Sequence, residues 1–274
     1  MTRKDPNDSF KEFEHAGWER AAGGYHHAFG ALTQQAIPAL LDAAAVQAGT
    51  RVLDVATGPG YAAAAAAARG ARVTGVDFSA EMVVQAGQRF PGIEFGEGDA
   101  ENLSFPDASF DAVVMNFGML HLARPEQAMA EARRVLRPGG RFAFTVWSEP
   151  PETVGFGIVL RAIETLGNLD AGLPPGPPFF RFANPQEARG ELSAAGFADP
   201  QTARVPLVWQ LDSPDALFLS FYEPSVRTRA LLRAQTPEAL SAIRTAIVAD
   251  AARHLRDGKV VFPMPAVLSS AVKK

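Results

Sequence analysis

Residues 52–60 read VLDVATGPG, and the chain continues as YAAAAAAARG over 61–70. An apolar run containing one aspartate gives way to small residues, and an alanine-rich segment of high helix propensity follows. This pattern predicts a buried strand, a tight turn and a helix. Gly58 and Gly60 allow the backbone to turn sharply and to come close to a ligand. Such turns often hold nucleotides, and several kinds of nucleotide cofactor use them.

The same alternation continues beyond this turn. Short apolar runs rich in Val, Phe and Ile cover residues 51–56, 71–77, 93–99, 110–117 and 141–147. Helical patterns fall between them at 61–69, 79–89 and 125–136. Strands that alternate with helices indicate parallel βαβ units, and continuous apolar runs are typical of strands buried on both faces. An α/β doubly wound sheet is therefore expected.

The N-terminal segment reads as helical. Ser9 and Glu12 fit a capping box, which predicts a helix starting near Phe10. We expect Gly23-Gly24 to break or hinge this helix, and a second helix to cover 31–47 despite its proline.

The C-terminal half is less regular. Residues 185–197 predict a helix that ends at Gly196, and 213–256 are helical in pattern. Segments 203–211 and 260–272 each predict one strand, the latter with prolines at an irregular start. We expect three parts: N-terminal helices forming a lid (1–47), a cofactor-binding core (48–150), and cap segments with a helical insert and the last strands (151–274).

Bulk composition excludes several classes of protein. The 274 residues are 47% hydrophobic and 20% charged, as expected of a globular chain, and the net charge of -4 argues against a nucleic-acid partner or an anionic membrane surface. The absence of cysteine excludes disulfides and thiolate chemistry. The polar start contains no secretory signal, and no apolar run is long enough to span a bilayer. A cytoplasmic protein is expected.

Asp77 ends the second apolar run and marks a second candidate position. A carboxylate there can accept hydrogen bonds from both hydroxyls of a ribose. Gly58, Gly60 and Ala63 also satisfy the loose dinucleotide pattern, so a nicotinamide cofactor remains possible at this point. Asp77 is equally suited to capping the helix that begins near Ser79.

Other motifs separate these possibilities. GDAEN (98–102) closes the third run, FPDASFDAVVMNF leads into the fourth, and EARRVLRPGGRFAF passes from a helix through a Pro-Gly-Gly turn into the fifth. Together with Asp54 in the first run, they resemble the class I S-adenosylmethionine-dependent methyltransferases. The resemblance is to the branch that contains the ubiquinone and menaquinone C-methyltransferases. It is strong over roughly 45–150, where Ala56 replaces the glycine of many relatives; alanine fits that position if its φ is negative.

The resemblance implies a Rossmann-like sheet of seven strands, mostly parallel with one antiparallel strand, and S-adenosylmethionine as the cofactor. It implies that Asp77 holds the ribose, that Asp99 and the Ala100 backbone meet adenine, and that Phe78 and Met82 flank the ring. Asn116 and Phe117 would border the methionine part. The cofactor-binding residues expected on this basis are Asp54, Ala56, Thr57, Gly58, Gly60, Asp77, Phe78, Ser79, Met82, Asp99, Ala100, Glu101, Asn116 and Phe117.

Methyl transfer needs alignment first and a base only where the acceptor must lose a proton. His121 follows the fourth strand near the expected methyl position and is the candidate base. The alternative is that His121 is a structural residue of its loop. Tyr25 is the second catalytic candidate, since Trp18, Tyr25 and Phe29 share one helical face if the helix continues. No histidine or carboxylate set has metal-ligand spacing, so no metal is expected.

The acceptor is expected to be a small molecule. Segments 150–183 and 213–256 supply Phe156, Phe179, Phe180, Phe218, Phe221 and Tyr222 with few fixed charges, which favours a ring-containing, mostly apolar acceptor. Two alternatives stay open: a nicotinamide-dependent dehydrogenase, and a domain that binds S-adenosylmethionine without catalysis. The sequence gives no oligomeric state.

Overall fold

The computed structural model describes residues 5–274. Its main sheet has seven strands in the order β3-β2-β1-β4-β5-β10-β6. The strands β1 to β5 run parallel to one another, and β10 is antiparallel to both of its neighbours, β5 and β6. This confirms the expected seven-stranded sheet with one antiparallel strand. The strands are β1 (Arg51–Val55), β2 (Arg72–Asp77), β3 (Glu94–Glu97), β4 (Phe110–Asn116), β5 (Leu136–Trp147), β6 (Phe197–Val205) and β10 (Ala266–Lys273).

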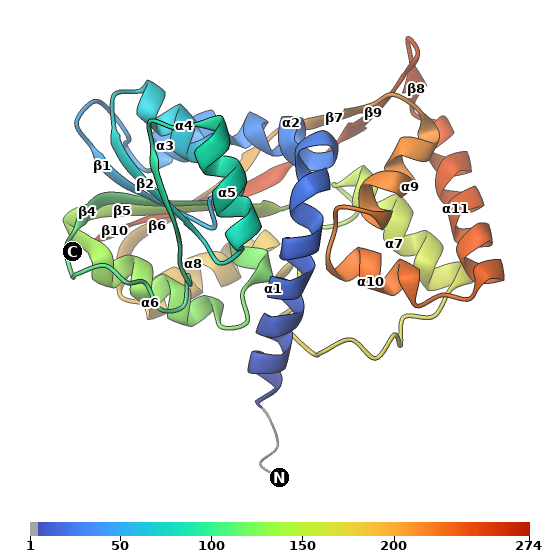
Figure 1. Ribbon diagram of the computed structural model, residues 1–274, viewed down its shortest axis with the longest axis horizontal. Helices are drawn as coiled ribbons and strands as arrows, with labels where there is room; N and C mark the ends of the chain where they lie inside the picture. The colour runs from blue at the N-terminus through green and yellow to red at the C-terminus, as the bar shows by residue number, and fades with distance from the viewer. Residues whose placement is uncertain (1–4) are drawn as a thin grey trace.

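Helices cover both faces of this sheet (Figure 1). One face packs against α3 (Ile37–Ala43), α4 (Tyr61–Ala68) and α5 (Ala80–Arg89), and the other against α6 (Pro125–Val135) and α8 (Pro185–Ala194). Adjacent residues of β1 illustrate why the strands read as continuous apolar runs. Val52 is buried on the α3–α4 side and Leu53 on the opposite side, because successive side chains of a strand point to opposite faces.

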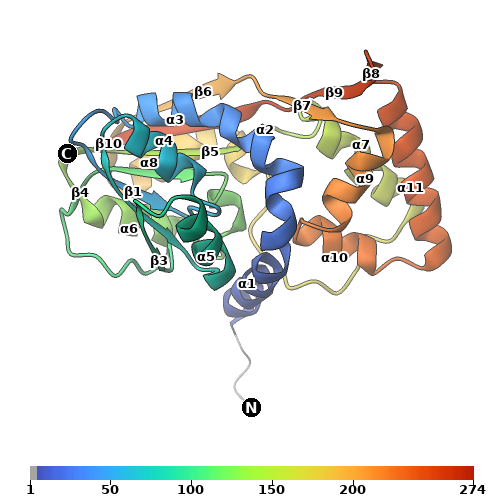
Figure 2. The same cartoon turned by 45° about the horizontal axis from the view of Figure 1, so that its top comes forward.

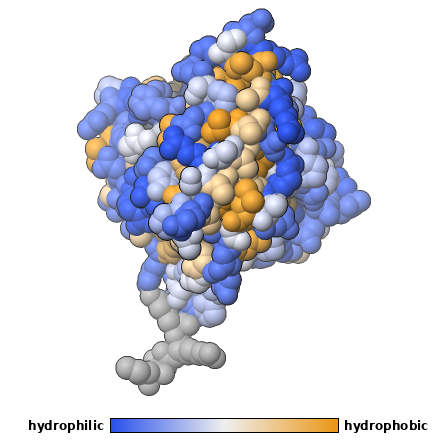
Figure 3. Space-filling model, turned by 90° about the vertical axis from the view of Figure 1, so that its right-hand side faces the viewer, coloured by the Kyte–Doolittle hydropathy of each residue, from blue (hydrophilic) through white to orange (hydrophobic). Residues whose placement is uncertain are grey.

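A helical cap stands beside the sheet (Figures 1 and 2). It consists of α7 (Val154–Leu166), α9 (Pro214–Tyr222), α10 (Arg227–Arg233) and α11 (Pro237–Ala252), with a three-stranded sheet of β7 (Val208–Leu211), β9 (Lys259–Pro263) and β8 (Leu255–Arg256). Figure 3, viewed from the cap side, shows a band of apolar surface bordered by hydrophilic side chains.

The helix α1 (Pro6–Tyr25) crosses the molecule between the sheet domain and the cap (Figure 1). It begins at Pro6, with the Asp5 side chain accepting a hydrogen bond from the Asn7 amide, so the expected capping box at Ser9 is wrong. The expected break at Gly23-Gly24 is also wrong. A Cβ at Gly24 would lie 3.1 Å from the Pro224 Cβ, so this glycine permits close packing within a continuous helix.

Beyond Tyr25 the helix widens into a π-helical turn (His26–Gly30), and α2 (Ala31–Thr33), a 3-10 turn (Gln34–Ala36) and α3 follow. The second expected helix is therefore a chain of short helical pieces. Mid-helix π turns often occur at functional sites, and this one lies where α1 meets the cap.

Two single-strand predictions in the C-terminal half are wrong. Segment 203–211 holds the end of β6 and the whole of β7, and 260–272 holds parts of β9 and β10, so each passes from one sheet to the other. Pro206 and Pro265 lie at these crossings. Proline has no N–H for a ladder hydrogen bond, so it ends pairing in one sheet before the chain enters the next. The helix ending before Gly196 and the helical character of 213–256 are confirmed.

Candidate functional site

A cleft opens at the carboxyl ends of β1, β2 and β4, where the strand order reverses. Its empty volume is about 720 Å³. Ligands bind at this place in open α/β sheets. Most of the residues expected at the site line the cleft, namely Tyr25, Ala56, Gly58, Asp77, Phe78, Met82, Asp99, Ala100, Glu101, Asn116, Phe117 and His121.

The turn after β1 brings the backbone to the cleft through left-handed residues. Ala56, Gly58 and Gly60 have φ angles of +53°, +52° and +85°. The expectation of a negative φ at Ala56 is therefore wrong. The left-handed conformation costs a non-glycine residue about 1–2 kcal/mol, and the turn retains alanine at this position despite that cost.

Four residues expected at the site lie behind the cleft wall and do not line it: Asp54, Thr57, Gly60 and Ser79. Asp54 accepts hydrogen bonds from the Thr57 hydroxyl at 2.6 Å and from the Ala63 amide at 2.9 Å. It thereby joins the end of β1 to the first turn of α4. Burial raises the pKa of Asp54 to about 7, and its Oδ1 has no partner among the described residues. The geometry favours a role in holding the turn.

Asp77 is presented to the cleft from the end of β2. The Gly58 amide donates to its Oδ2 at 2.8 Å, and the Ser79 amide donates to its Oδ1 at 3.0 Å. Each carboxylate oxygen keeps lone pairs for a further donor, so two ribose hydroxyls fit this group. Burial raises the pKa of Asp77 to about 6. Ser79 caps α5, its hydroxyl accepting from the Met82 amide at 3.2 Å.

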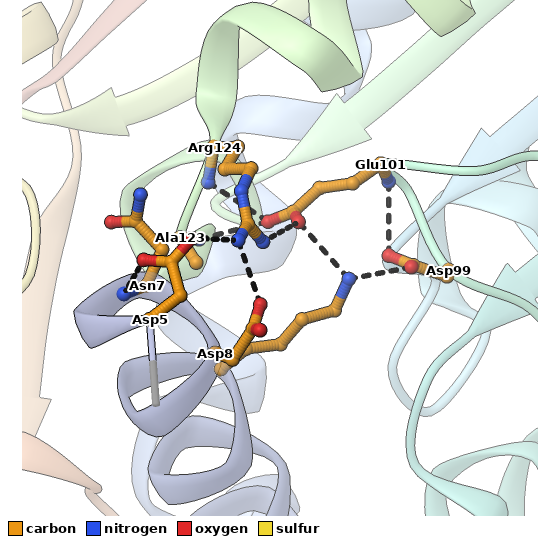
Figure 4. A network of polar contacts seen from close by, with 8 residues as sticks. Asp5, Asn7, Asp8, Asp99, Glu101, Ala123 and Arg124 are labelled. Carbon is orange, nitrogen blue, oxygen red and sulfur yellow. Dashed lines mark hydrogen bonds and ion pairs between the residues drawn. The ribbon is translucent and has the colours of Figure 1, made fainter. Parts of the chain in front are cut away.

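A second part of the cleft, away from Asp77, is lined by a network of charged side chains. One of them, Lys11, was not predicted from the sequence. The Lys11 ammonium lies 2.5 Å from Asp99 and 3.0 Å from Glu101. The Glu101 amide donates to Asp99 Oδ1 at 3.0 Å, while Glu101 Oε1 accepts from the Ala123 and Arg124 amides (Figure 4). This part of the cleft is therefore closed by a lysine from α1.

The same network ties the start of α1 to the loop after β4. The Arg124 guanidinium donates to Asp5 at 2.9 Å and to Asp8 at 2.7 Å, and it lies 3.6 Å from Glu101 (Figure 4). We call Asp5, Asp8, Arg124, Glu101 and Lys11 with Asp99 the Arg124 network. Its members are up to 119 residues apart in the sequence, so no local pattern predicts that they meet.

A third part of the cleft is formed by Asn116 and Phe117 at the end of β4. Asn116 accepts from the Thr145 hydroxyl at 2.7 Å and donates to the Thr33 carbonyl at 3.2 Å. Phe117 has a φ of +57°, and its ring packs on Trp147 with centroids 4.1 Å apart. Strained backbone of this kind concentrates at functional sites, where the surrounding structure holds it.

A second cavity, with an empty volume of about 530 Å³, adjoins the first. The two share a wall made of Trp18, Tyr25, Phe117 and His121. The remaining lining of the second cavity is Phe29, Thr33, Trp147, Phe156, Phe179, Phe221, Ser225, Val226, Arg227 and Thr228. Of the aromatic residues expected around the acceptor, Phe180, Phe218 and Tyr222 do not line it; Phe218 and Tyr222 stack on each other, with centroids 5.0 Å apart.

The two catalytic candidates both belong to the shared wall. His121 Nδ1 lies 3.0 Å from Glu14 Oε2, a residue of α1 that the sequence did not single out. The Tyr25 hydroxyl donates to Thr33 at 3.2 Å, and burial raises the pKa of Tyr25 to about 12. Tyr25 therefore stays protonated at neutral pH, which favours a contact role over a proton-accepting one. His26 and His27 line neither cavity.

No cluster of three or more histidine and carboxylate side chains within 5–274 is arranged to hold a metal ion. Among the helices of that part of the chain, none combines the length and apolar character needed to cross a membrane.

Comparison with known proteins agrees with this geometry. A family model described as a methyltransferase domain matches residues 53–144. A demethylmenaquinone methyltransferase of Thermus thermophilus is 36% identical over 176 residues, which cover 58% of this chain and 79% of the relative. One from Clavibacter sepedonicus is 40% identical over 127 residues, 44% of this chain and 52% of the relative. The chain spans about half the length of several such relatives.

Solved structures show the same fold. The YcgJ protein of Bacillus subtilis has a TM-score of 0.58 at 22% identity, covering 87% of this chain and 98% of that one. Phosphoethanolamine N-methyltransferase 2 of Haemonchus contortus, in complex with S-adenosyl-L-methionine, has a TM-score of 0.57 at 19% identity and covers 97% of this chain and 60% of that one.

The sheet order, the glycine turn and the acidic residues at the strand ends define a Rossmann-like protein with a site for an adenosine-containing cofactor. The sequence relatives make this assignment specific: the chain belongs to the class I S-adenosylmethionine-dependent methyltransferases, in the branch of the ubiquinone and menaquinone enzymes. The cofactor of this family is S-adenosylmethionine.

Proposed function

We propose that this protein transfers a methyl group from S-adenosylmethionine in the first cavity to a small, ring-containing, mostly apolar acceptor in the second. The observation that carries the proposal is the shared wall of Trp18, Tyr25, Phe117 and His121. Two ligands in adjoining cavities can bring donor and acceptor atoms together only where the cavities meet. Residues 1–47 would then act as the lid, 48–150 as the cofactor-binding core, and 151–274 as the acceptor cap with the last strands.

The cofactor supplies a methyl group on a positively charged sulfur, so the chain's own task is mainly alignment. Holding two reactants in line contributes about 7–11 kcal/mol in favourable cases. Asp77 would hold the ribose end and Asp99 the adenine end, while Asn116 and Phe117 border the side that faces the second cavity. The α1 helix covers both cavities and excludes water.

The lining of the second cavity supports an aromatic acceptor. Five of its side chains are Phe or Trp besides those of the shared wall. Its one cation, Arg227, donates hydrogen bonds to Glu14 and to the Pro177 and Leu120 carbonyls. Ring stacking and apolar burial therefore dominate the expected recognition. Relatives named as demethylmenaquinone and ubiquinone/menaquinone methyltransferases make quinone-type rings the first acceptors to try.

The test combines binding and turnover. Isothermal titration should show saturable binding of S-adenosylmethionine and S-adenosylhomocysteine, and no comparable binding of NAD. Incubation with S-adenosylmethionine and reduced hydroxynaphthalenes should then give a product heavier by one methylene, detected by mass spectrometry, with one S-adenosylhomocysteine per product. Binding without turnover on a broad panel of phenols, amines and acids would support the non-catalytic alternative. Binding of NAD in place of both methionine ligands would support the dehydrogenase.

A further inference from the structure

Glu14 is a carboxylate with no exposed surface, and both its oxygens have partners from distant parts of the chain. Its Oε2 lies 3.0 Å from His121 Nδ1 and its Oε1 lies 2.7 Å from Arg227 Nε; the Glu14 side chain is 0% exposed. Arg227 also donates to the Leu120 and Pro177 carbonyls, each at 3.0 Å. Arg227 alone would neutralise the charge of Glu14. The additional contact between Glu14 and His121 therefore needs its own explanation.

The state of Glu14 determines which nitrogen of His121 carries a proton. Although burial alone raises the pKa of Glu14, the adjacent His121 and Arg227 outweigh it and hold that pKa below its usual value. An ionised carboxylate only accepts hydrogen bonds. The Nδ1 atom is therefore the donor, and a neutral ring then carries its lone pair on Nε2.

The surroundings leave this Nε2 available to a ligand. Within residues 5–274 the only hydrogen-bond partner of the His121 side chain is Glu14, and the side chain, 18% exposed, lines both cavities. The ring is held edge-on between Trp18 and Phe179, with centroid distances of 4.8 and 5.8 Å. Its orientation is thus set by packing on two sides and by Glu14 on the third.

We infer that Glu14 is a positioning residue that presents His121 Nε2 as a base at the junction of the two cavities, and that the acceptor carries an ionisable hydroxyl on its ring. This inference rests on the proposed methyl transfer. Arg227 keeps Glu14 charged, so α1, the loop after β4 and α10 must all be docked before the base is correctly held. Closure of α1 over the site and correct orientation of His121 for proton removal then occur together.

The proton step balances as follows. The acceptor's O–H bond breaks, the proton goes to Nε2, and the electron pair stays on the oxygen and is shared with the conjugated ring carbon. One of these two atoms forms the bond to the methyl carbon as the carbon–sulfur bond breaks with its pair left on sulfur. If the ring carbon is methylated, its C–H bond breaks, the electron pair restores the ring, the proton goes to water, and the oxygen takes a proton from water. Nε2 then releases its proton to water.

The first readout needs neither cofactor nor acceptor. Long-range ¹⁵N NMR of the free protein at pH 8 should show His121 with its proton on Nδ1, assigned among the five histidines by comparison with His121→Ala. Glu14→Gln should give a mixture with the Nε2-protonated form, since an amide can accept from or donate to Nδ1. Glu12→Gln, an acid-to-amide change at an exposed position of the same helix, should leave the spectrum unchanged. A doubly protonated ring or an Nε2-protonated ring in the wild type would overturn the inference.

The second readout is kinetic, with 1,4-dihydroxynaphthalene kept reduced as the acceptor. Glu14→Gln should lower kcat roughly ten- to hundredfold, up to the lower limit of what a general base contributes, because the base is still present and only its orientation and tautomer are lost. The KM for S-adenosylmethionine should change little, and Glu12→Gln should behave like the wild type. The loss should shrink for an acceptor whose hydroxyl is already ionised.

A double variant guards against an unstable single one. Glu14→Gln leaves Arg227 buried without its anion, whereas Glu14→Gln with Arg227→Met removes both charges, a change that proteins often tolerate. The double variant should show the same mixed histidine forms and a low kcat. Unchanged histidine signals and kcat in a folded variant, beside an active wild type, would overturn the inference. A wild type that binds S-adenosylhomocysteine but methylates no acceptor would instead count against the proposed function.

Discussion

Gly60 shows how strongly the site depends on one residue without a side chain. A Cβ at this position would lie 2.9 Å from the Phe95 ring, whereas a Cβ at Gly58 would meet open space. Ala56 adopts a left-handed conformation although it has a Cβ. This Cβ restricts position 118, where a Cβ would lie only 2.6 Å from it. The small residues at 56 and 118 therefore form a packed pair in the wall of the cleft.

Also at the residue scale, Asp77→Ala should weaken binding of S-adenosylhomocysteine more than Asp99→Ala. Asp77 is expected to accept from two ribose hydroxyls and Asp99 from one adenine amine, and each hydrogen bond to a charged group contributes about 1.5–3 kcal/mol. Asp99 is already paired with Lys11, which lowers its share further. Isothermal titration of both variants measures the difference, and wild-type affinity in Asp77→Ala would refute the ribose assignment.

The titration of Asp77 adds a pH dependence to the same measurement. Because burial raises its pKa to about 6 in the free protein, the carboxyl is protonated below that pH and ionised above it. The ribose hydroxyls bind the ionised form, so affinity should fall as the pH is lowered through about 6. Asp77→Asn should bind more weakly at pH 8 and lose most of this slope.

The proposed function makes α1 the element that controls access to the cofactor cleft. The start of α1 is held by the Arg124 network, its middle by the buried contacts of Glu14, and its end by packing of Gly24 against Pro224. The exposed ion pairs of Arg124 with Asp5 and Asp8 each stabilise the structure by about 0–1 kcal/mol, so the start of α1 can detach at little cost in free energy.

At the element scale, Arg124→Gln should therefore speed release of S-adenosylhomocysteine several-fold while lowering the melting temperature little. The change removes the contacts to Asp5 and Asp8 without altering a cavity wall. Stopped-flow displacement measures the release rate. Arg69→Gln, which breaks an ion pair with Asp42 away from the site, is the control. Raised salt should speed release in the wild type and have less effect in Arg124→Gln; identical rates in all three proteins would show that the network is not a latch.

At the scale of the whole molecule, the site is assembled between two bodies. The sheet domain supplies most of the first cavity, and α1 lies between the sheet and the cap (Figure 2). The cap supplies Phe156 and Phe221 to the second cavity, whose other aromatic side chains come from the N-terminal helical segment, the strand ends and the loop that holds Phe179. The division of labour predicts that changes in the cap alter acceptor binding and leave the cofactor untouched.

Phe156→Leu tests this division. Phe156 lines only the second cavity and contacts the rings of Trp147 and Phe221, so the smaller side chain should raise the acceptor KM several-fold and leave the affinity for S-adenosylhomocysteine unchanged. Phe218→Leu removes a ring of similar burial that lines neither cavity, and its acceptor KM should stay near the wild-type value. Equal changes in both variants would mean that the cap acts only through stability.

Local pattern alone determined much of this protein. Strand and helix types in residues 51–147, the glycine turn, and Asp77 at the end of its strand were readable because burial and turn chemistry act on neighbouring residues. The aromatic row of Trp18, Tyr25 and Phe29 was readable for the same reason, and it lies along the cavities as its spacing predicts. These features depend on the period of a helix or a strand and on little else.

Tertiary structure alone decided the rest. Glu14 meets Arg227 across 213 residues and Lys11 meets Asp99 across 88, and no periodicity within one segment can signal such a pair. Two C-terminal segments pass from one sheet to the other at prolines. Gly24 allows close packing against Pro224 where a helix break was expected. Each of these features depends on a segment that is distant in the sequence and adjacent only in the folded protein. Charge pairs and close approaches depend on three-dimensional distance, which the chain order does not contain.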